Sequence, residues 1–129
     1  MLDSVTDLAS LLKDPSLLVF KSYVAGEWVD ADDGSTFPVT NPARGDVICQ
    51  LPNLGRAEAA RAIKAAHKAH RDWAGRTGKE RAQVLRKWFD LLMANQDDLG
   101  RLMTAEQGKP FAEAKGEVAY AASFVEWFA

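Results

Sequence analysis

The run MTAEQGKPF at residues 103–111 contains the signals that end one helix and begin another. Gly108 follows a helical pattern, and glycine adopts the left-handed conformation that closes a helix without a Cβ penalty. Pro110 comes two positions later, where its missing N–H costs nothing if a new helix begins there. We therefore predict two helices joined by a short connection, the second running toward the end of the chain.

The second of these helices is apolar around most of its circumference. At about 100° per residue, one apolar stripe consists of Ala114, Val118, Ala121, Ala122 and Val125. The other stripe consists of Tyr120, Phe124, Trp127 and Phe128. A helix of this kind is normally buried on several sides. Because the sequence ends at Ala129 without a capping glycine or a terminal cation, we expect a chain cut inside a helix, with a large part of the molecule missing.

The first third of the sequence predicts a short helix and β-hairpins. Val5–Lys13 has helical spacing, and Asp3 or Ser4 can cap it. Phe20–Val29 is rich in aromatic and β-branched residues, and Ala25-Gly26 in its middle predicts a tight turn between two strands. A second pair of strands is expected at Phe37–Thr40 and Val47–Leu51, joined by the turn sequence at 41–45.

The remaining residues predict four consecutive helices. Apolar residues recur at helical spacing over Arg56–Trp73, and Gly75 closes that helix. Thr77 and Glu80 then form a capping box for the next helix. We divide the chain into an arm with a short helix (1–22), β-hairpins (23–52) and helices (53–129).

Composition limits the classes of function. The chain has 129 residues, of which 47% are hydrophobic and 26% charged, which is typical of a globular protein. A formal net charge of -2 gives no electrostatic reason to expect nucleic acid. The longest apolar run is too short to span a bilayer, and the start is acidic, unlike a secretory signal. We expect a cytoplasmic protein that binds neither nucleic acid nor membrane.

Residue chemistry alone yields no catalytic constellation. Cys49 is the only cysteine, and no cation or helix start near it in the sequence would lower its pKa, so we interpret it as a structural thiol. His67 and His70 lie one turn apart without a third ligand nearby, which argues against a metal site. The glycines match no phosphate-binding pattern. The residues by themselves indicate a helical scaffold segment.

Several stretches nevertheless resemble the aldehyde dehydrogenase superfamily, and specifically its succinate-semialdehyde dehydrogenase branch. The strongest are LMTAEQGKPFAEAKGEV at 102–118 and YAASFVEWFA at 120–129. The others, in the same order and spacing, are Gly26-Glu27-Trp28-Val29, Asn41-Pro42, Gly45-Asp46, Trp73 and Lys79-Glu80-Arg81. The resemblance covers Tyr23 to the end of the chain.

This resemblance implies an α/β protein in which hairpins and consecutive helices flank a Rossmann-like domain that lies downstream. The implied activity is oxidation of succinate semialdehyde to succinate with NAD or NADP, through a cysteine thioester. The implied assembly is a homo-oligomer, and the partner is a small aldehyde substrate. None of the family's catalytic or cofactor-binding residues falls within these positions, and Cys49 matches none of them. We therefore expect this segment to belong to the coenzyme-binding domain and to be inactive alone.

The resemblance also implies two sites in this chain. Glu106, with main-chain oxygens of Val39 and Thr40, corresponds to a structural Na⁺ or K⁺ site, and hard cations prefer such oxygen ligands. The alternative for Glu106 is a solvated or hydrogen-bonded carboxylate. Tyr120 corresponds to a residue that lines the aldehyde entry tunnel, with plain helix packing as its alternative.

Two other interpretations of the whole chain stay open. It could be a self-contained helical interaction module that buries Phe124, Trp127 and Phe128 against another protein, or a truncated relative that docks on intact subunits without catalysis. Because the aromatic stripe has no evident cover, we also expect the isolated chain to self-associate.

Overall fold

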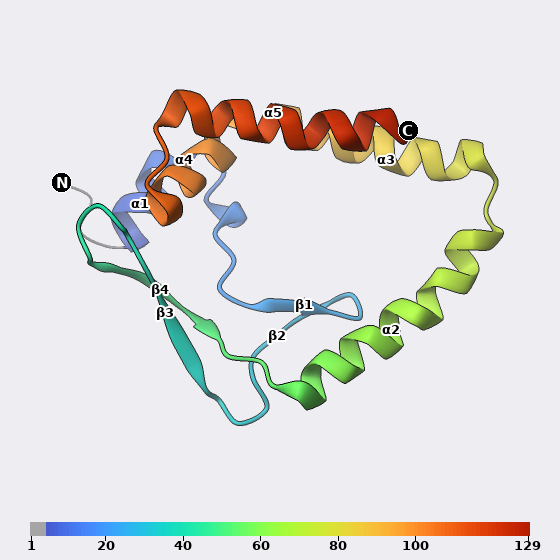
Figure 1. Cartoon of the computed structure of the whole chain (residues 1–129), viewed down its shortest axis with the longest axis horizontal. Helices are drawn as coiled ribbons and strands as arrows, with labels where there is room; N and C mark the ends of the chain where they lie inside the picture. Colours follow the sequence, from blue (N-terminus) through green and yellow to red (C-terminus); the bar gives the residue numbers. More distant parts are fainter. Residues whose placement is uncertain (1–4) are drawn as a thin grey trace.

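The computed structural model describes residues 5–129. The elements are α1 (Val5–Leu11), a 3-10 turn η1 (Pro15–Leu17), β1 (Ser22–Val24), β2 (Glu27–Val29), β3 (Thr36–Thr40), β4 (Val47–Pro52), α2 (Arg56–Gly75), α3 (Gly78–Ala94), α4 (Gln96–Gln107) and α5 (Phe111–Trp127). Hairpins followed by four helices are confirmed. Figure 1 shows them in an open circuit, with α3, α4 and α5 packed together, the hairpins on one side and α2 on another.

Each hairpin turns where the sequence predicted. Strands β1 and β2 are antiparallel, with Ser22 opposite Val29, and the turn residues Ala25 and Gly26 have φ values of 56° and 93°. Positive φ at both turn positions matches the right-handed twist of the strands. In the second hairpin the register shifts between Val39 and Thr40, which marks a β-bulge.

Helix α1 is shorter than predicted, ending at Leu11 rather than Lys13. The backbone N–H groups of Lys13 and Asp14 donate to the carboxylate of Asp98 at 3.1 and 2.9 Å instead of to helix carbonyls. Asp98 lies in the first turn of α4 and is only 2% exposed. This carboxylate therefore ends α1 and ties it to α4. The cap predicted at Asp3 or Ser4 lies outside the described residues.

The helix boundaries downstream follow local signals. Thr77 and Glu80 form the predicted capping box, with the Glu80 carboxylate accepting from Thr77 N at 2.8 Å and Thr77 Oγ1 accepting from Glu80 N at 3.3 Å. Gly108 closes α4 with a left-handed φ of 78°. Pro110 is extended and precedes the first residue of α5, and its carbonyl accepts from Ala114 N at 2.9 Å.

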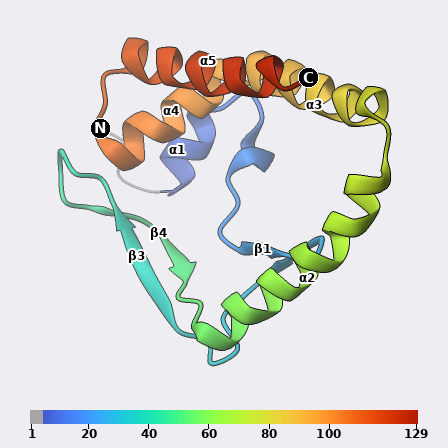
Figure 2. The same cartoon turned by 45° about the vertical axis from the view of Figure 1, so that its right-hand side comes forward.

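Helix α5 lies along α3 and α4, as both views show (Figures 1 and 2). Ala114, Val118 and Ala122 on this side are buried, which confirms most of the predicted stripe, although Ala121 is exposed. Gly100 of α4 permits the close approach, because a Cβ there would lie 3.0 Å from Lys115 Cγ and 3.2 Å from Phe111 Cε2. Small side chains thus set the distance between α4 and α5.

Much apolar surface remains uncovered by residues 5–129. On α2, Ile63 is 71% exposed, and on α3, Trp88 is 54% exposed. The opposite side of α5 is the most exposed of all, with Trp127 at 83% and Phe128 at 73%. None of the helices in the described part of the chain is long and apolar enough to cross a membrane.

Replacing Asp98 with Asn should destabilise the chain in a pH-dependent way. Backbone donors from Asp14 and Lys13 hold the pKa of Asp98 below its ordinary value of 3.8. A carboxyl with a depressed pKa in the folded state stabilises the fold above its unfolded pKa, and this contribution disappears as the pH falls through the folded pKa. Thermal unfolding of D98N should therefore occur below that of the wild type at neutral pH, with the gap closing as the pH falls below 3.8.

The exposed Asp90 of α3 provides the control for this experiment. D90N should unfold close to the wild type across the same pH range. A D98N deficit that stayed constant down to acid pH would contradict the role given to the ionised carboxylate.

Substituting Gly100 with alanine should test the close packing of α4 and α5. Overpacking costs about 1–3 kcal/mol, and the helix-propensity gain of alanine returns at most about 1 kcal/mol. The matched control is Gly116 of α5, around which a Cβ would meet nothing within 4 Å. Chemical denaturation should show G116A at least as stable as the wild type and G100A less stable than G116A. Equal effects of the two substitutions would contradict the packing described here.

Candidate functional site

The turn of the second hairpin rests against the end of α4. Gly45 in this turn has a φ of 79°, and its N–H donates to the Asn41 carbonyl at 2.7 Å. A Cβ added at Gly108 would lie 3.0 Å from Pro42 Cγ. Gly108 therefore serves two purposes, since it supplies the left-handed cap of α4 and leaves room for Pro42.

This contact brings Glu106 of α4 into the neighbourhood of the hairpin. Glu106 borders a shallow apolar hollow that Leu102, Met103 and Val118 also line. Its side chain is exposed on one side, yet desolvation by its surroundings raises the pKa of the carboxyl. Within residues 5–129, none of the ion pairs includes Glu106. A carboxylate in such surroundings is favoured when a cation lies beside it.

Cys49 lies on the neighbouring strand β4, directly opposite Val39. Burial raises the pKa of its thiol, and the negative charge of Glu106 raises it further. Both effects disfavour the thiolate that nucleophilic chemistry requires. Cys49 is therefore not an activated nucleophile. The pKa of its thiol nevertheless depends on the charge of Glu106.

The structure places the predicted cation ligands on adjoining elements. Val39 and Thr40 end β3, two to three residues before Pro42, and Pro42 meets Gly108 two residues after Glu106. The carboxylate of Glu106 and the two main-chain carbonyls are oxygen donors, the kind of ligand that hard cations prefer, and their joint binding of Na⁺ or K⁺ stays a prediction. Among residues 5–129, the region around Glu106 included, no group of three or more His, Cys, Asp or Glu residues is placed to hold a metal ion.

Tyr120, the predicted tunnel residue, lies on the exposed side of α5. It is 63% exposed, and its ring meets Phe124 edge-on, with the ring centroids 4.9 Å apart. His67 and His70 are both exposed on α2. The structure therefore places the ring of Tyr120 against the aromatic residues of α5.

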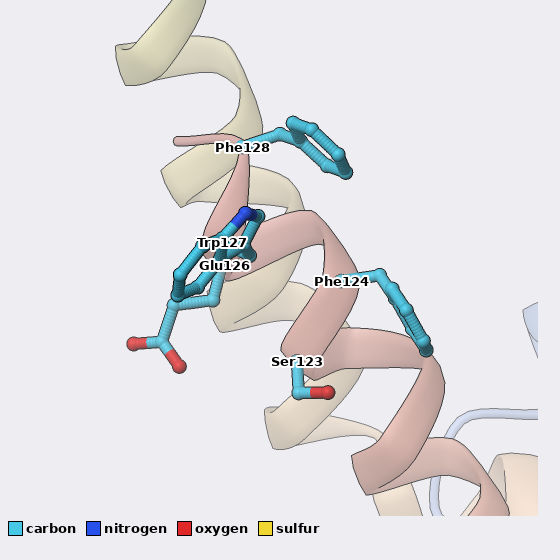
Figure 3. A pocket seen from close by; sticks show the side chains of 5 residues that line it. All are labelled: Ser123, Phe124, Glu126, Trp127 and Phe128. Carbon is cyan, nitrogen blue, oxygen red and sulfur yellow. The ribbon is translucent and has the colours of Figure 1, made fainter.

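The carboxyl-terminal turns of α5 form an exposed aromatic hollow. Ser123, Phe124, Glu126, Trp127 and Phe128 line it, and Figure 3 shows the rings of Phe124 and Phe128 projecting to the same side of the helix. At its edge, Glu126 accepts a hydrogen bond from Arg86 of α3 at 2.8 Å. This ion pair holds the end of α5 to α3 and leaves the aromatic rings facing outward.

Two buried carboxylates, Asp98 and Glu58, hold loop backbone against the first turns of α4 and α2. Asp98 binds the segment after α1, and Glu58 accepts from the N–H groups of Gly55 and Asp32, each at 3.1 Å. Both residues lie in the first turn of a helix, where acidic side chains are favoured. That position is a sequence signal for capping, but it does not reveal the distant backbone that each carboxylate also binds.

Comparison with known proteins shows the family to which the chain belongs. The sequence model of the aldehyde dehydrogenase family matches residues 28–129, and the chain belongs to this family. It is 61% identical over 118 residues to a glutarate-semialdehyde dehydrogenase from Pseudomonas putida, which covers 92% of this chain and 25% of that protein. It is 54% identical to the NADP⁺-dependent succinate-semialdehyde dehydrogenase of Escherichia coli, covering 92% of this chain and 24% of that protein.

The fold agrees with the sequence. A crystal structure of succinate-semialdehyde dehydrogenase from Burkholderia pseudomallei superimposes with a TM-score of 0.88 at 57% identity, covering 90% of this chain and 24% of that one. The mixed hairpin-and-helix arrangement is thus that of the amino-terminal region of aldehyde dehydrogenases. The chain spans about a quarter of the length of the curated relatives it matches.

Proposed function

We propose that this chain forms the amino-terminal part of the coenzyme-binding domain of an NAD(P)-dependent semialdehyde dehydrogenase. The observation that carries the proposal is the match to the family over residues 28–129, together with relatives that act on semialdehydes. The substrate is an aldehyde with a carboxylate at its far end, succinate semialdehyde first and glutarate semialdehyde second. The full-length enzyme is a homo-oligomer that works in the cytoplasm.

The part of this chain in that reaction is structural. Oxidation of the aldehyde to the acid takes up water and passes a hydride to the nicotinamide, and a thiolate and a general base carry these steps. Cys49 is unsuited to the first role, because burial and Glu106 both raise the pKa of its thiol. The chain alone is therefore inactive, and its helices position groups contributed by the rest of the enzyme.

Within this function, Glu106 and the main-chain oxygens of Val39 and Thr40 hold a structural Na⁺ or K⁺. Support comes from the contact between the hairpin turn and α4, and from a desolvated carboxylate whose pKa is raised. A bound cation would neutralise that carboxylate and tie the hairpin to α4. Tyr120 lines the route by which the aldehyde enters, which its exposure on α5 supports.

A self-contained interaction module is the second candidate function. The exposed aromatic hollow at the end of α5 favours it, because contiguous apolar surface of this kind marks an interaction site. Under this alternative, the chain would bind a protein unrelated to dehydrogenases and would support no oxidation in any context.

A covalent chimera separates these candidates. Residues 1–129 would replace the matching quarter of the E. coli succinate-semialdehyde dehydrogenase, with the remainder of that enzyme unchanged. We expect oxidation of succinate semialdehyde with kcat/KM within about tenfold of the parent enzyme, measured by reduction of the nicotinamide. The isolated chain should show no turnover. Tyr120→Ala in the chimera should raise KM for the aldehyde more than KM for the nicotinamide. An inactive but folded chimera would remove the basis for the enzyme assignment.

The cation site can be tested through the single cysteine. Alkylation of Cys49 at mildly alkaline pH should be faster in NaCl or KCl than in tetramethylammonium chloride of equal ionic strength. The reason is that a cation at Glu106 cancels the charge that raises the pKa of the thiol. E106Q should react faster than the wild type in the tetramethylammonium salt and should not respond to the choice of cation.

Glu113→Gln, which removes an exposed acid of α5, provides the control and should behave as the wild type does. If the wild-type rate does not depend on the cation while E106Q still reacts faster, Glu106 lies near Cys49 but holds no ion.

A further inference from the structure

Helix α2 has one strongly basic side. The helix contains five Lys and Arg residues but only two acidic residues, in a chain whose formal net charge is -2. At about 100° per residue, four of these cations lie within about 120° of the helix circumference. They are Arg56, Lys64, Lys68 and Arg71, all of them exposed, and we call them the basic face of α2.

The acidic residues of α2 do not neutralise this face. Glu58 is buried and accepts hydrogen bonds from two backbone N–H groups. Asp72 borders the hollow between α2 and the β1–β2 hairpin. Within residues 5–129, none of the ion pairs includes a residue of the basic face. Because Lys64 and Lys68 lie one helical turn apart, their like charges repel, and a bound anion would relieve this repulsion.

The edge of the basic face shows which anion suits it. Arg61 lies at this edge and donates to both carboxylate oxygens of Asp32, each at 2.7 Å. Asp32 belongs to the acidic run DADD at residues 30–33, between β2 and β3. A guanidinium that binds a carboxylate through two parallel hydrogen bonds is a specific way to recognise an acidic side chain. A short acidic segment of this chain thus already binds beside the basic face.

Two other kinds of anion fit the face less well. A membrane binds an amphipathic helix through its apolar side, but on that side of α2 Ala62, Ala65 and Ala69 border the hollow that the β1–β2 hairpin shares. A nucleic acid would extend beyond the helix, and outside α2 the acidic residues of the chain outnumber the basic ones by five. Their repulsion opposes a long polyanion more than it opposes a segment of a few residues.

We propose that the basic face of α2 is a docking surface for an acidic segment of another protein. From Arg56 to Arg71 the face extends about 22 Å along the helix axis, which an extended peptide covers with about seven residues. The partner therefore presents a short run rich in Asp and Glu. Helix α2 lies apart from α3, α4 and α5, so these helices do not obstruct the approach (Figures 1 and 2). This inference goes beyond the proposed function and does not depend on it.

Titration of an acidic peptide tests the proposal. The probe is a fluorescein-labelled peptide with about seven consecutive Glu residues, enough to cover the face when extended. Fluorescence anisotropy with residues 1–129, at concentrations where sedimentation shows a single species, should reveal saturable binding. Affinity should fall by about tenfold or more between about 20 and 200 mM NaCl, because salt screens exposed charges. A peptide with Gln in place of each Glu should not bind. Absence of saturable binding of the Glu peptide at low salt would overturn the proposal.

Charge-reversal variants locate the contact. Lys64→Glu combined with Lys68→Glu should weaken binding by about tenfold or more, because repulsion replaces attraction at two positions. The matched control combines Lys79→Glu with Lys87→Glu on α3, two exposed lysines outside ion pairs, and changes the net charge equally. The control should bind within about twofold of the wild type. Circular dichroism checks that the helices persist in each variant. Equal weakening by both pairs would indicate a response to net charge alone and overturn the proposal.

The longer enzyme and other anions complete the test. The covalent chimera should bind the Glu peptide as residues 1–129 do, and loss of binding there would assign the face to the rest of the enzyme and overturn the proposal. Tighter binding of duplex DNA, or of vesicles containing phosphatidylserine, than of the Glu peptide would overturn it in favour of that anion. Oxidation of succinate semialdehyde by the chimera is measured separately, so an inactive chimera that binds the peptide counts against the proposed function alone.

Discussion

The close packing of α5 on α4 is the constraint on which the rest of this structure depends. Gly100 removes the side chain that would separate the two helices, and Ala114 and Ala122 are completely buried. Small residues and Phe111 occupy this side of α5, whereas the exposed rings of Tyr120, Phe124 and Trp127 lie elsewhere on the helix. Contact with α4 therefore buries one side of α5, while the aromatic side stays exposed within residues 5–129.

A second contact, between the hairpin turn and the end of α4, depends on Gly108. Its left-handed conformation ends the helix, and its missing Cβ admits Pro42. The result is that a strand pair and a helix end, separated by more than fifty residues in the sequence, share one small region containing Cys49 and Glu106. This geometry supports the structural role that we propose for the region.

Local signals in the sequence determined the elements with few errors. The capping box at Thr77 and Glu80, the glycine stop at 108 and the turn at Ala25-Gly26 each depend on residues within a few positions of one another. The family could also be recognised from the sequence, since its motifs lie in order along the chain. The end of α1 was misplaced because Asp98, more than eighty residues away, binds the N–H groups that would have extended the helix.

What the sequence determined by itself is thus the set of helices and hairpins, and the fact that α5 has two apolar sides. Only the tertiary structure decided which of those sides is buried within residues 5–129 and which is left exposed. Periodicity reports that a side chain is apolar, but the partner against which it packs depends on contacts between distant segments. The proximity of Glu106 to Cys49 and the unexplained space around Gly116 belong to that second kind of information.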